Sequence, residues 1–471
     1  MPAAPLRVDD ARDFADGFAA IREKLDIAVE HPAAAVAEAE AAAARGPSLP
    51  AAEDLRGLPF VTIDPPGSRD LDQAVFIEPA GSGWVVHYAI ADVAAFVTPG
   101  GPLDEEARRR GVTIYLPDAK APLHPFVLSE GAASLLPGED RQAVVWRIAV
   151  DEAGEATDFT VRRAVVCSRA AFAYEQVQAA LDADHPDALR AVRGLGLARE
   201  QRQATRGGLD LRLPDQAVVK STTARGYQLV YRAPLPVEGW NAQVSLLAGE
   251  CAARLMVDAG VGVLRTLPPP GEGTVARLRR HAKALDVPWP AHAGYASFLR
   301  SLDPADPDHA ALIVQSASLA RGASYVSFTT PPSGDVTHSA VTTPYAHVTA
   351  PLRRLVDRFG NEVVLSLCAG TPVPDWVLAA LPTLPDVMNK ARQRERAAER
   401  MAVDLAESLV LAGCEGAVLD GVVVDVDRDR ATVQLARPAV VADVEGSGLA
   451  LGDEVRVAVS AGATLLRVLA E

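Results

Sequence analysis

The pattern of apolar residues changes twice along this 471-residue chain, and these changes restrict the fold more than any other feature. Stretches rich in β-branched and aromatic residues predict strands at 60–63, 75–77, 84–90, 144–150 and 158–168. Helical periodicity dominates from about residue 171, and short strands return over 420–471. Because strands and helices are segregated, we predict an α+β fold that ends in a small OB-type β-barrel.

The predicted elements divide the chain into three parts. A helical N-terminal segment, 1–55, begins with a helix capped by Asp9 or Asp10, and Gly46-Pro47 end its helical stretch. The main domain, 56–411, contains helices predicted at 104–110, 174–183, 186–206, 241–259, 274–285, 310–319, 353–367 and 387–412. The last part, 412–471, contains strands predicted at 421–426, 431–435, 454–459 and 464–469.

Composition limits the class of protein. With 23% charged and 49% hydrophobic residues, the chain is too apolar for a disordered tail and too charged for a membrane bundle. No apolar run approaches the roughly 18 residues of a spanning helix, and the start MPAAPLRVDD does not resemble a secretory signal. The four cysteines lie far apart without metal or disulfide spacing. We therefore expect a cytoplasmic protein without a membrane partner.

The net charge of −15 argues against a protein that coats nucleic acid nonspecifically. It does not exclude a nucleic-acid enzyme, because binding needs only a local basic channel. Candidate cations for such a channel are Arg108–Arg110, Arg277–Lys283, Arg353 and Arg354 with Arg358, and Lys390–Arg400. On any one helix, these residues more often form a solvated face.

An acidic turn over 62–74 is the most informative segment for chemistry. Asp64 follows a predicted strand, Pro65-Pro66-Gly67 reverses the chain, and Asp70 and Asp72 then lie two residues apart. Because residues i and i+2 of extended backbone project to the same side, the three carboxylates can converge. Oxygen ligands of this kind suit Mg²⁺ or Mn²⁺. A solvated Asp-rich turn, or a calcium loop, remains the alternative from these residues alone.

Five other segments occur in a fixed order with this turn. They are His87–Val93, Tyr115–Pro117 with Leu128–Glu130 and Ser134-Leu135, Ala173–Val177, Tyr345–Arg354 and Arg396–Arg400. Together they resemble the RNB family, the ribonuclease II and ribonuclease R type of 3′→5′ exoribonuclease, over about residues 56–412. The resemblance implies that the main domain is an RNB catalytic domain, a mixed β-sheet surrounded by helices.

The resemblance also implies roles for particular residues. Asp64, Asp70 and Asp72 fall on the family's metal-binding and catalytic aspartates, and Arg353 falls on the catalytic arginine that contacts the scissile phosphate. RNA-binding positions are Tyr115, Tyr174, Arg353, Arg354, Gln243 and Glu399. Taken alone, each tyrosine is more often a core residue, and Arg353 is more often an ordinary surface arginine.

Two residues depart from the family pattern. Gln73 stands where a fourth metal-binding carboxylate is usual, and Gln243 stands where a second site glutamate is usual. Each glutamine keeps an oxygen ligand but removes a negative charge, so we expect weaker Mg²⁺ binding. The chain also resembles a short form without the two cold-shock-type barrels that typically precede the catalytic domain.

The implied activity is processive, metal-assisted hydrolysis of single-stranded RNA to nucleoside 5′-monophosphates, with Mg²⁺ as cofactor and Mn²⁺ as a substitute. The alternative is a weakened family member that binds RNA or a protein partner without efficient cleavage. Over 411–471 there is no Phe, Tyr or Trp, and five arginines stand against ten acidic residues. We therefore expect the barrel to contribute little to RNA binding, because such barrels stack bases on aromatic rings in a positive groove.

Overall fold

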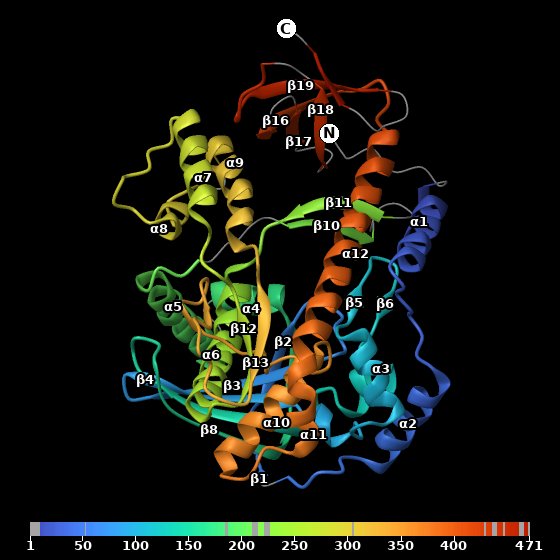
Figure 1. Cartoon of the computed structure of the whole chain (residues 1–471), viewed down its shortest axis with the longest axis vertical. Helices are drawn as coiled ribbons and strands as arrows, with labels where there is room; N and C mark the ends of the chain where they lie inside the picture. Colours follow the sequence, from blue (N-terminus) through green and yellow to red (C-terminus); the bar gives the residue numbers. More distant parts are fainter. Residues whose placement is uncertain are drawn as a thin grey trace.

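The computed structural model describes residues 10–51, 53–183, 187–209, 215–220, 227–303, 306–427, 430–435, 440–445, 448–460 and 466–469. It confirms the α+β fold: a seven-stranded mixed sheet lies among helices, and a closed five-stranded barrel lies near the C-terminus (Figure 1). The proposed cap at Asp9 lies outside the described residues.

The central sheet has the strand order β1-β8-β7-β4-β3-β2-β9. Its strands are β1 (Glu53–Asp54), β2 (Val61–Asp64), β3 (Gln73–Ala80), β4 (Gly83–Ala91), β7 (Asp140–Val150), β8 (Ala156–Cys167) and β9 (Ala170–Ala173). The outer pairs β1·β8 and β2·β9 are parallel, and the inner pairs are antiparallel. Fully buried Tyr88, Ile90, Trp146 and Ile148 on β4 and β7 anchor the main hydrophobic core.

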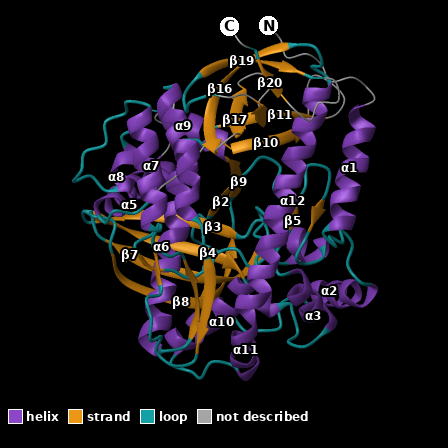
Figure 2. Cartoon of the chain, turned by 45° about the horizontal axis from the view of Figure 1, so that its top comes forward, coloured by secondary structure: helices purple, strands orange, loops and turns teal. Residues whose placement is uncertain are grey.

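Helices lie on this sheet and beside it (Figure 2). They are α3 (Pro102–Arg110), α4 (Tyr174–Asp182), α5 (Asp187–Thr205), α6 (Pro236–Ala259), α7 (Glu272–Ala284), α8 (Tyr295–Arg300), α9 (Pro307–Ser316), α10 (Leu355–Ala369), α11 (Asp375–Ala380) and α12 (Leu384–Ala412). α4, α5, α6 and α10 contact strands of the sheet, whereas α7, α8 and α9 share a separate hydrophobic core. α6 starts five residues earlier than predicted, because Pro236 is tolerated in its first turn. α10 starts two residues later than predicted, because Arg354 forms a β-bridge with Val112.

The N-terminal segment forms two helices rather than one continuous helical stretch: α1 (Asp10–Lys24) and α2 (Ala33–Arg45). The linker between them contains Asp26 in a left-handed conformation, with φ of 50°. Arg110 donates hydrogen bonds to two backbone carbonyls in this linker. α1 packs along α12, and its buried Phe14 joins the main core.

Several short strands escaped the sequence analysis. They pair as β5 (Ile114–Tyr115) with β6 (Lys120–Ala121), β10 (Asp215–Lys220) with β11 (Tyr227–Arg232), β12 (Gly262–Thr266) with β13 (Ser324–Phe328), and β14 (Thr337–His338) with β15 (Thr343–Pro344). The β12·β13 pair joins segments about 60 residues apart, which no local pattern reveals.

The barrel closes in the order β16-β17-β18-β20-β19. Its strands are β16 (Val418–Asp427), β17 (Arg430–Leu435), β18 (Val440–Glu445), β19 (Glu454–Val459) and β20 (Leu466–Val468), of which β18 was not predicted. α12 runs from the main body up to the barrel (Figure 1). Near its end, the Glu407 carboxylate accepts hydrogen bonds from the Val441 amide at 2.7 Å and the Gln216 side chain at 2.6 Å. One carboxylate thus ties α12, the barrel and the β10–β11 hairpin together.

Candidate active site

The acidic turn joins β2 to β3 and is held rigidly by a neighbouring segment. Gly67 takes a positive φ of 79°, which permits the tight reversal after the prolines. Ser134 Oγ donates to the Arg69 carbonyl at 2.6 Å and accepts from the Leu71 amide at 3.0 Å. Leu71, which separates Asp70 from Asp72 in the sequence, has a buried side chain. The loop therefore presents Asp70 and Asp72 from a fixed backbone.

Asp72 is buried, with 2% of its surface exposed. Its Oδ1 accepts from the Leu352 amide at 2.7 Å, and its Oδ2 accepts from Arg353 Nε at 3.3 Å. Burial raises the pKa of Asp72 to about 8, while Arg353 and the Leu352 amide favour the ionised form. The Arg353 side chain is 44% exposed. Asp72 therefore orients a guanidinium that still faces solvent.

Asp70 lies beside the β5–β6 hairpin. Its Oδ2 accepts from the Tyr115 hydroxyl at 2.7 Å, and its Oδ1 accepts from Lys120 Nζ at 2.9 Å. The same ammonium donates to Glu130 Oε1 at 2.5 Å. Burial opposes the charge on Lys120, but the hydrogen bonds to Glu130 and Asp70 raise its pKa above the ordinary value. The ring of Tyr115 remains 47% exposed.

Asp64 ends β2 and lies opposite Ala173 of β9, so that Tyr174 follows immediately at the start of α4. Burial raises the pKa of Asp64 to about 6; Arg353 opposes this shift and Asp70 adds to it. Burial, and then the charge of Asp64, raise the pKa of the Tyr174 hydroxyl. The ionisation of Asp64 is therefore linked to the charges of Asp70 and Arg353, and that of Tyr174 to the charge of Asp64.

The two glutamines and Glu399 take other positions. Gln73 begins β3, and its Oε1 accepts from the Tyr88 hydroxyl at 2.8 Å. Gln243 is buried on α6 and donates to Gln203 of α5 at 2.7 Å. Glu399 is exposed on α12. The roles of these three residues in metal or RNA binding stay predictions.

Some cations predicted to line an RNA channel act inside the protein instead. Arg110 and Arg358 are buried, and Arg358 donates to Asp104 Oδ1 at 2.6 Å. The prediction of phosphate contacts is wrong for these two residues, because their guanidiniums are shielded from a ligand. Arg354 forms a two-point ion pair with Asp357, at 2.8 and 3.0 Å, and its role in RNA binding stays a prediction.

Within the described residues, no three His, Cys, Asp or Glu side chains lie close enough together to hold a metal ion. Mg²⁺ is often bound by only one or two carboxylates, with water and substrate phosphates completing its shell. Asp64 and Asp70 provide such an oxygen pair, and the burial that raises the pKa of Asp64 favours a compensating cation. These two residues fit Mg²⁺ or Mn²⁺. The side-chain oxygens of Asp70, Asp72 and Gln73 all accept hydrogen bonds within the protein.

Sequence reasoning missed two groups beside the candidate ligands, Lys120 and the Tyr88–Ser245 pair. The Tyr88 hydroxyl lies 2.7 Å from Ser245 Oγ and links β4 to α6 behind Gln73. Tyr88 stood within a recognised motif, but nothing local showed the direction of its hydroxyl. Lys120 follows Tyr115 by five residues, and only the hairpin brings it onto Asp70.

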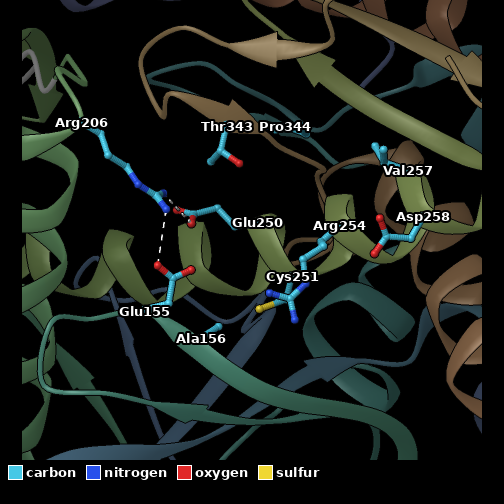
Figure 3. A pocket seen from close by; sticks show the side chains of 10 residues that line it. All are labelled: Glu155, Ala156, Arg206, Glu250, Cys251, Arg254, Val257, Asp258, Thr343 and Pro344. Atoms are coloured by element: carbon cyan, nitrogen blue, oxygen red, sulfur yellow. Dashed lines mark ion pairs between the residues drawn. The ribbon is translucent and has the colours of Figure 1, made fainter. Parts of the chain in front are cut away.

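A separate cavity of about 170 Å³ lies along α6, and none of the candidate site residues line it. Figure 3 shows carboxylates and guanidiniums meeting there, including the ion pairs of Arg206 with Glu155 and Glu250. The other lining residues are Ala156, Cys251, Arg254, Val257, Asp258, Thr343 and Pro344.

No helix within the described ranges combines the length and apolar character that a bilayer-spanning segment requires.

The family model of the RNB domain matches residues 52–365, and that of the RNase II-type exonuclease C-terminal S1 domain matches residues 417–461. The chain belongs to the RNB family. Both matches agree with the resemblance seen in the sequence, and the S1 match covers most of the C-terminal barrel.

This RNB protein is similar to curated proteins over parts of their length. It is 44% identical to Ribonuclease R of Escherichia coli K12 over 132 residues, which are 28% of this chain and 16% of that protein. It is 26% identical to Ribonuclease R of Thermotoga maritima over 395 residues, covering 80% of this chain and 55% of that protein. The chain therefore spans about half the length, or less, of these curated relatives.

Solved structures share the fold of this RNB protein. RNase R of Mycoplasma genitalium, in complex with ribose-methylated single-stranded RNA, superposes with a TM-score of 0.85 at 20% identity and covers 97% of this chain and 78% of that chain. Yeast Ssd1, described as a pseudonuclease, superposes with a TM-score of 0.70 at 16% identity and covers 90% of this chain and 54% of that chain. At these identities the likeness establishes the architecture alone.

Proposed function

We propose that this RNB protein is a 3′→5′ exoribonuclease that hydrolyses single-stranded RNA processively to nucleoside 5′-monophosphates with Mg²⁺ or Mn²⁺. The observation that carries the proposal is the contact between Arg353 and the buried Asp72 within a domain that matches the RNB family. This contact fixes Nε of Arg353 while the arginine side chain stays 44% exposed, so that a phosphate can reach the rest of the guanidinium. Similarity to proteins named Ribonuclease R supports the same reaction class.

In this proposal, Asp64 and Asp70 hold the divalent cation, and Asp72 is a positioning residue for Arg353. A bound cation of this kind supplies an activated water and neutralises phosphate charge. Arg353 Nε is fixed by Asp72, which leaves the rest of the exposed guanidinium to donate to the scissile phosphate. A donor oriented in advance stabilises the charge that develops in the transition state without reorganisation.

RNA would be held by aromatic and polar groups near these aspartates. The Tyr115 ring is exposed while its hydroxyl is anchored on Asp70, so that it offers a stacking face beside the site. Tyr174 starts α4 directly after Ala173, the strand partner of Asp64. We assign Arg354, Gln243 and Glu399 supporting roles along the RNA.

A second candidate function is an RNB protein that binds RNA or a protein partner without efficient cleavage. Gln73 and Gln243 favour it, because each removes a negative charge that the family usually carries. The similarity to Ssd1, described as a pseudonuclease, shows that this fold also occurs without nuclease activity. The first candidate is preferred, because Asp64, Asp70, Asp72 and Arg353 are all present.

We also propose a division into a helical segment (1–55), the RNB domain (56–411) and an OB-like domain (412–471). The start of the barrel at Val418 supports the last boundary.

A cytoplasmic location is supported by the four cysteines, all of which are free thiols.

The products distinguish the two candidates. Uniformly labelled single-stranded RNA is incubated with the protein and Mg²⁺, and the released labelled nucleotides are separated by chromatography. The proposal predicts nucleoside 5′-monophosphates, which continue to appear from bound RNA after excess competitor RNA is added. Nucleoside 3′-monophosphates, or intact RNA, would contradict it.

A further inference from the structure

Lys120 places a single ammonium between two carboxylates that belong to different parts of the fold. It lies on β6 and donates to Asp70 Oδ1 at 2.9 Å and to Glu130 Oε1 at 2.5 Å. Asp70 comes from the acidic turn, whereas Glu130 comes from the segment after the hairpin. The ammonium therefore has one partner inside the candidate metal site and one partner outside it.

Both carboxylate oxygens of Asp70 accept a hydrogen bond from the protein, and one of the two donors is charged. Oδ2 accepts from the Tyr115 hydroxyl at 2.7 Å, and Oδ1 accepts from Lys120. The side chain of Asp70 is only 10% exposed. A divalent cation at Asp70 is repelled by the ammonium on the same carboxylate, so the binding of Mg²⁺ or Mn²⁺ favours displacement of Lys120 from Oδ1.

Glu130 offers the Lys120 ammonium an alternative ion-pair partner. Its carboxylate is partly exposed, and its other oxygen lies 4.0 Å from Arg69 Nε, which is too long for a strong pair. The ammonium of Lys120 also lies near two exposed aromatic residues, with Nζ 5.7 Å from the Tyr115 ring centroid and 5.8 Å from the Phe126 ring centroid. Both rings attract the ammonium and favour its position near the two carboxylates.

We propose that Lys120 gates the divalent cation: it holds Asp70 when no metal is bound and withdraws to Glu130 when the metal binds. The inference rests on the proposed function, since it takes Asp70 as a metal ligand. The charge of the site makes the Lys120 ammonium important for metal affinity in this chain. Gln73 already removes one negative charge next to Asp72, so competition from an ammonium has a larger effect on metal affinity.

Two substitutions test the gate from opposite sides. Lys120→Met removes the charge but keeps an unbranched stem beside the rings, and it should lower the dissociation constant for Mn²⁺ about tenfold. Glu130→Gln removes the alternative partner and should raise that constant severalfold. If Glu130 acts through Lys120, then Glu130→Gln should change the constant by less than about twofold when Lys120→Met is already present.

The readout is Mn²⁺ binding to the full chain, measured by electron paramagnetic resonance of free Mn²⁺ without RNA. Arg22→Gln is the matched control, because it removes the 2.6 Å ion pair with Asp118 on the same hairpin without touching Asp70. Its Mn²⁺ affinity should equal that of the unaltered protein. Melting curves identify any variant that fails to fold, and the single and double variants provide independent measurements.

The outcomes separate the gate from the proposed function. Tighter binding in Lys120→Met, together with loss of the Glu130→Gln effect in the double variant, supports the gate. Equal affinity in the unaltered protein and Lys120→Met overturns the gate and leaves the metal site intact. No bound Mn²⁺ in any of the proteins overturns both the gate and the metal role proposed for Asp70.

Discussion

Arg353 donates from Nε to the buried carboxylate of Asp72 at 3.3 Å, across 281 positions of sequence. Next to it, the Leu352 amide donates to the other carboxylate oxygen, so that Asp72 fixes both the backbone and the side chain of this turn. The turn before α10 is thereby joined to the residue that precedes β3 of the central sheet. This relationship connects the two strongest motifs of the sequence in one site.

Gln73→Asp should lower the Mg²⁺ concentration needed for half-maximal activity, because it restores a negative charge beside Asp72. The buried Tyr88 hydroxyl loses its 2.8 Å contact with Gln73 but keeps Ser245 at 2.7 Å. Metal titrations of RNA cleavage measure the effect. Tyr88→Phe is the control, since it breaks the same hydrogen bond without a change of charge. A titration curve unmoved by Gln73→Asp would refute the charge argument.

Removal of the barrel after Leu411 should change the affinity for single-stranded RNA by less than about tenfold. This segment has no aromatic residue and twice as many acidic as basic residues, so stacking and phosphate attraction are weak. Arg430 is exposed, whereas Arg428 and Arg437 lie outside the described residues. Fluorescence anisotropy on a truncated protein with an intact melting transition measures the effect. A larger loss would mean that the barrel grips RNA directly.

His124 should make folding stability depend on pH. It is fully buried, and burial followed by the nearby Arg358 lowers its pKa to about 3. Between about pH 3 and 6.5 the unfolded chain therefore binds a proton that the folded protein does not, and stability falls as pH falls. From pH 7 to pH 5 this group should account for about 2 kcal/mol of lost stability.

The effect of His124 is isolated by comparison with a variant. Between the same pH values, His124→Asn should lose about 2 kcal/mol less stability than the unaltered protein, measured by urea unfolding. The exposed His292 supplies the control substitution, His292→Asn, which should follow the unaltered protein. Parallel curves for all three proteins would show that His124 titrates normally in the folded state.

Much of the fold followed from local patterns. The longer strands of the central sheet (β2, β3, β4, β7 and β8) and the long helices were predictable from their periods of two or 3.6 residues, their residue types and their end signals. The short strands were not. β10 and β11 pair only with each other, and β9 contains just Ala170–Ala173, so that tertiary pairing rather than composition defines them.

The sequence predicted which residues form the candidate site, but it did not predict which side chains they contact. The positions of Asp64, Asp70, Asp72 and Arg353 came from motifs. The ammonium of Lys120 on Asp70 and the turning of Gln243 toward Gln203 depend on the packing of distant elements. The burial of Arg110 could not be foreseen either, since the linker that it contacts lies about 80 residues earlier.

The cleavage pattern of 5′-labelled single-stranded RNA is the most direct test of exoribonuclease activity. With Mg²⁺ or Mn²⁺, the RNA should shorten stepwise from its 3′ end, and chelation of the metal should stop the shortening. Asp72→Asn should abolish shortening while RNA affinity stays within a few-fold, because the other RNA contacts remain. Internal cleavage products, shortening without metal, or full activity of Asp72→Asn would contradict the proposed function.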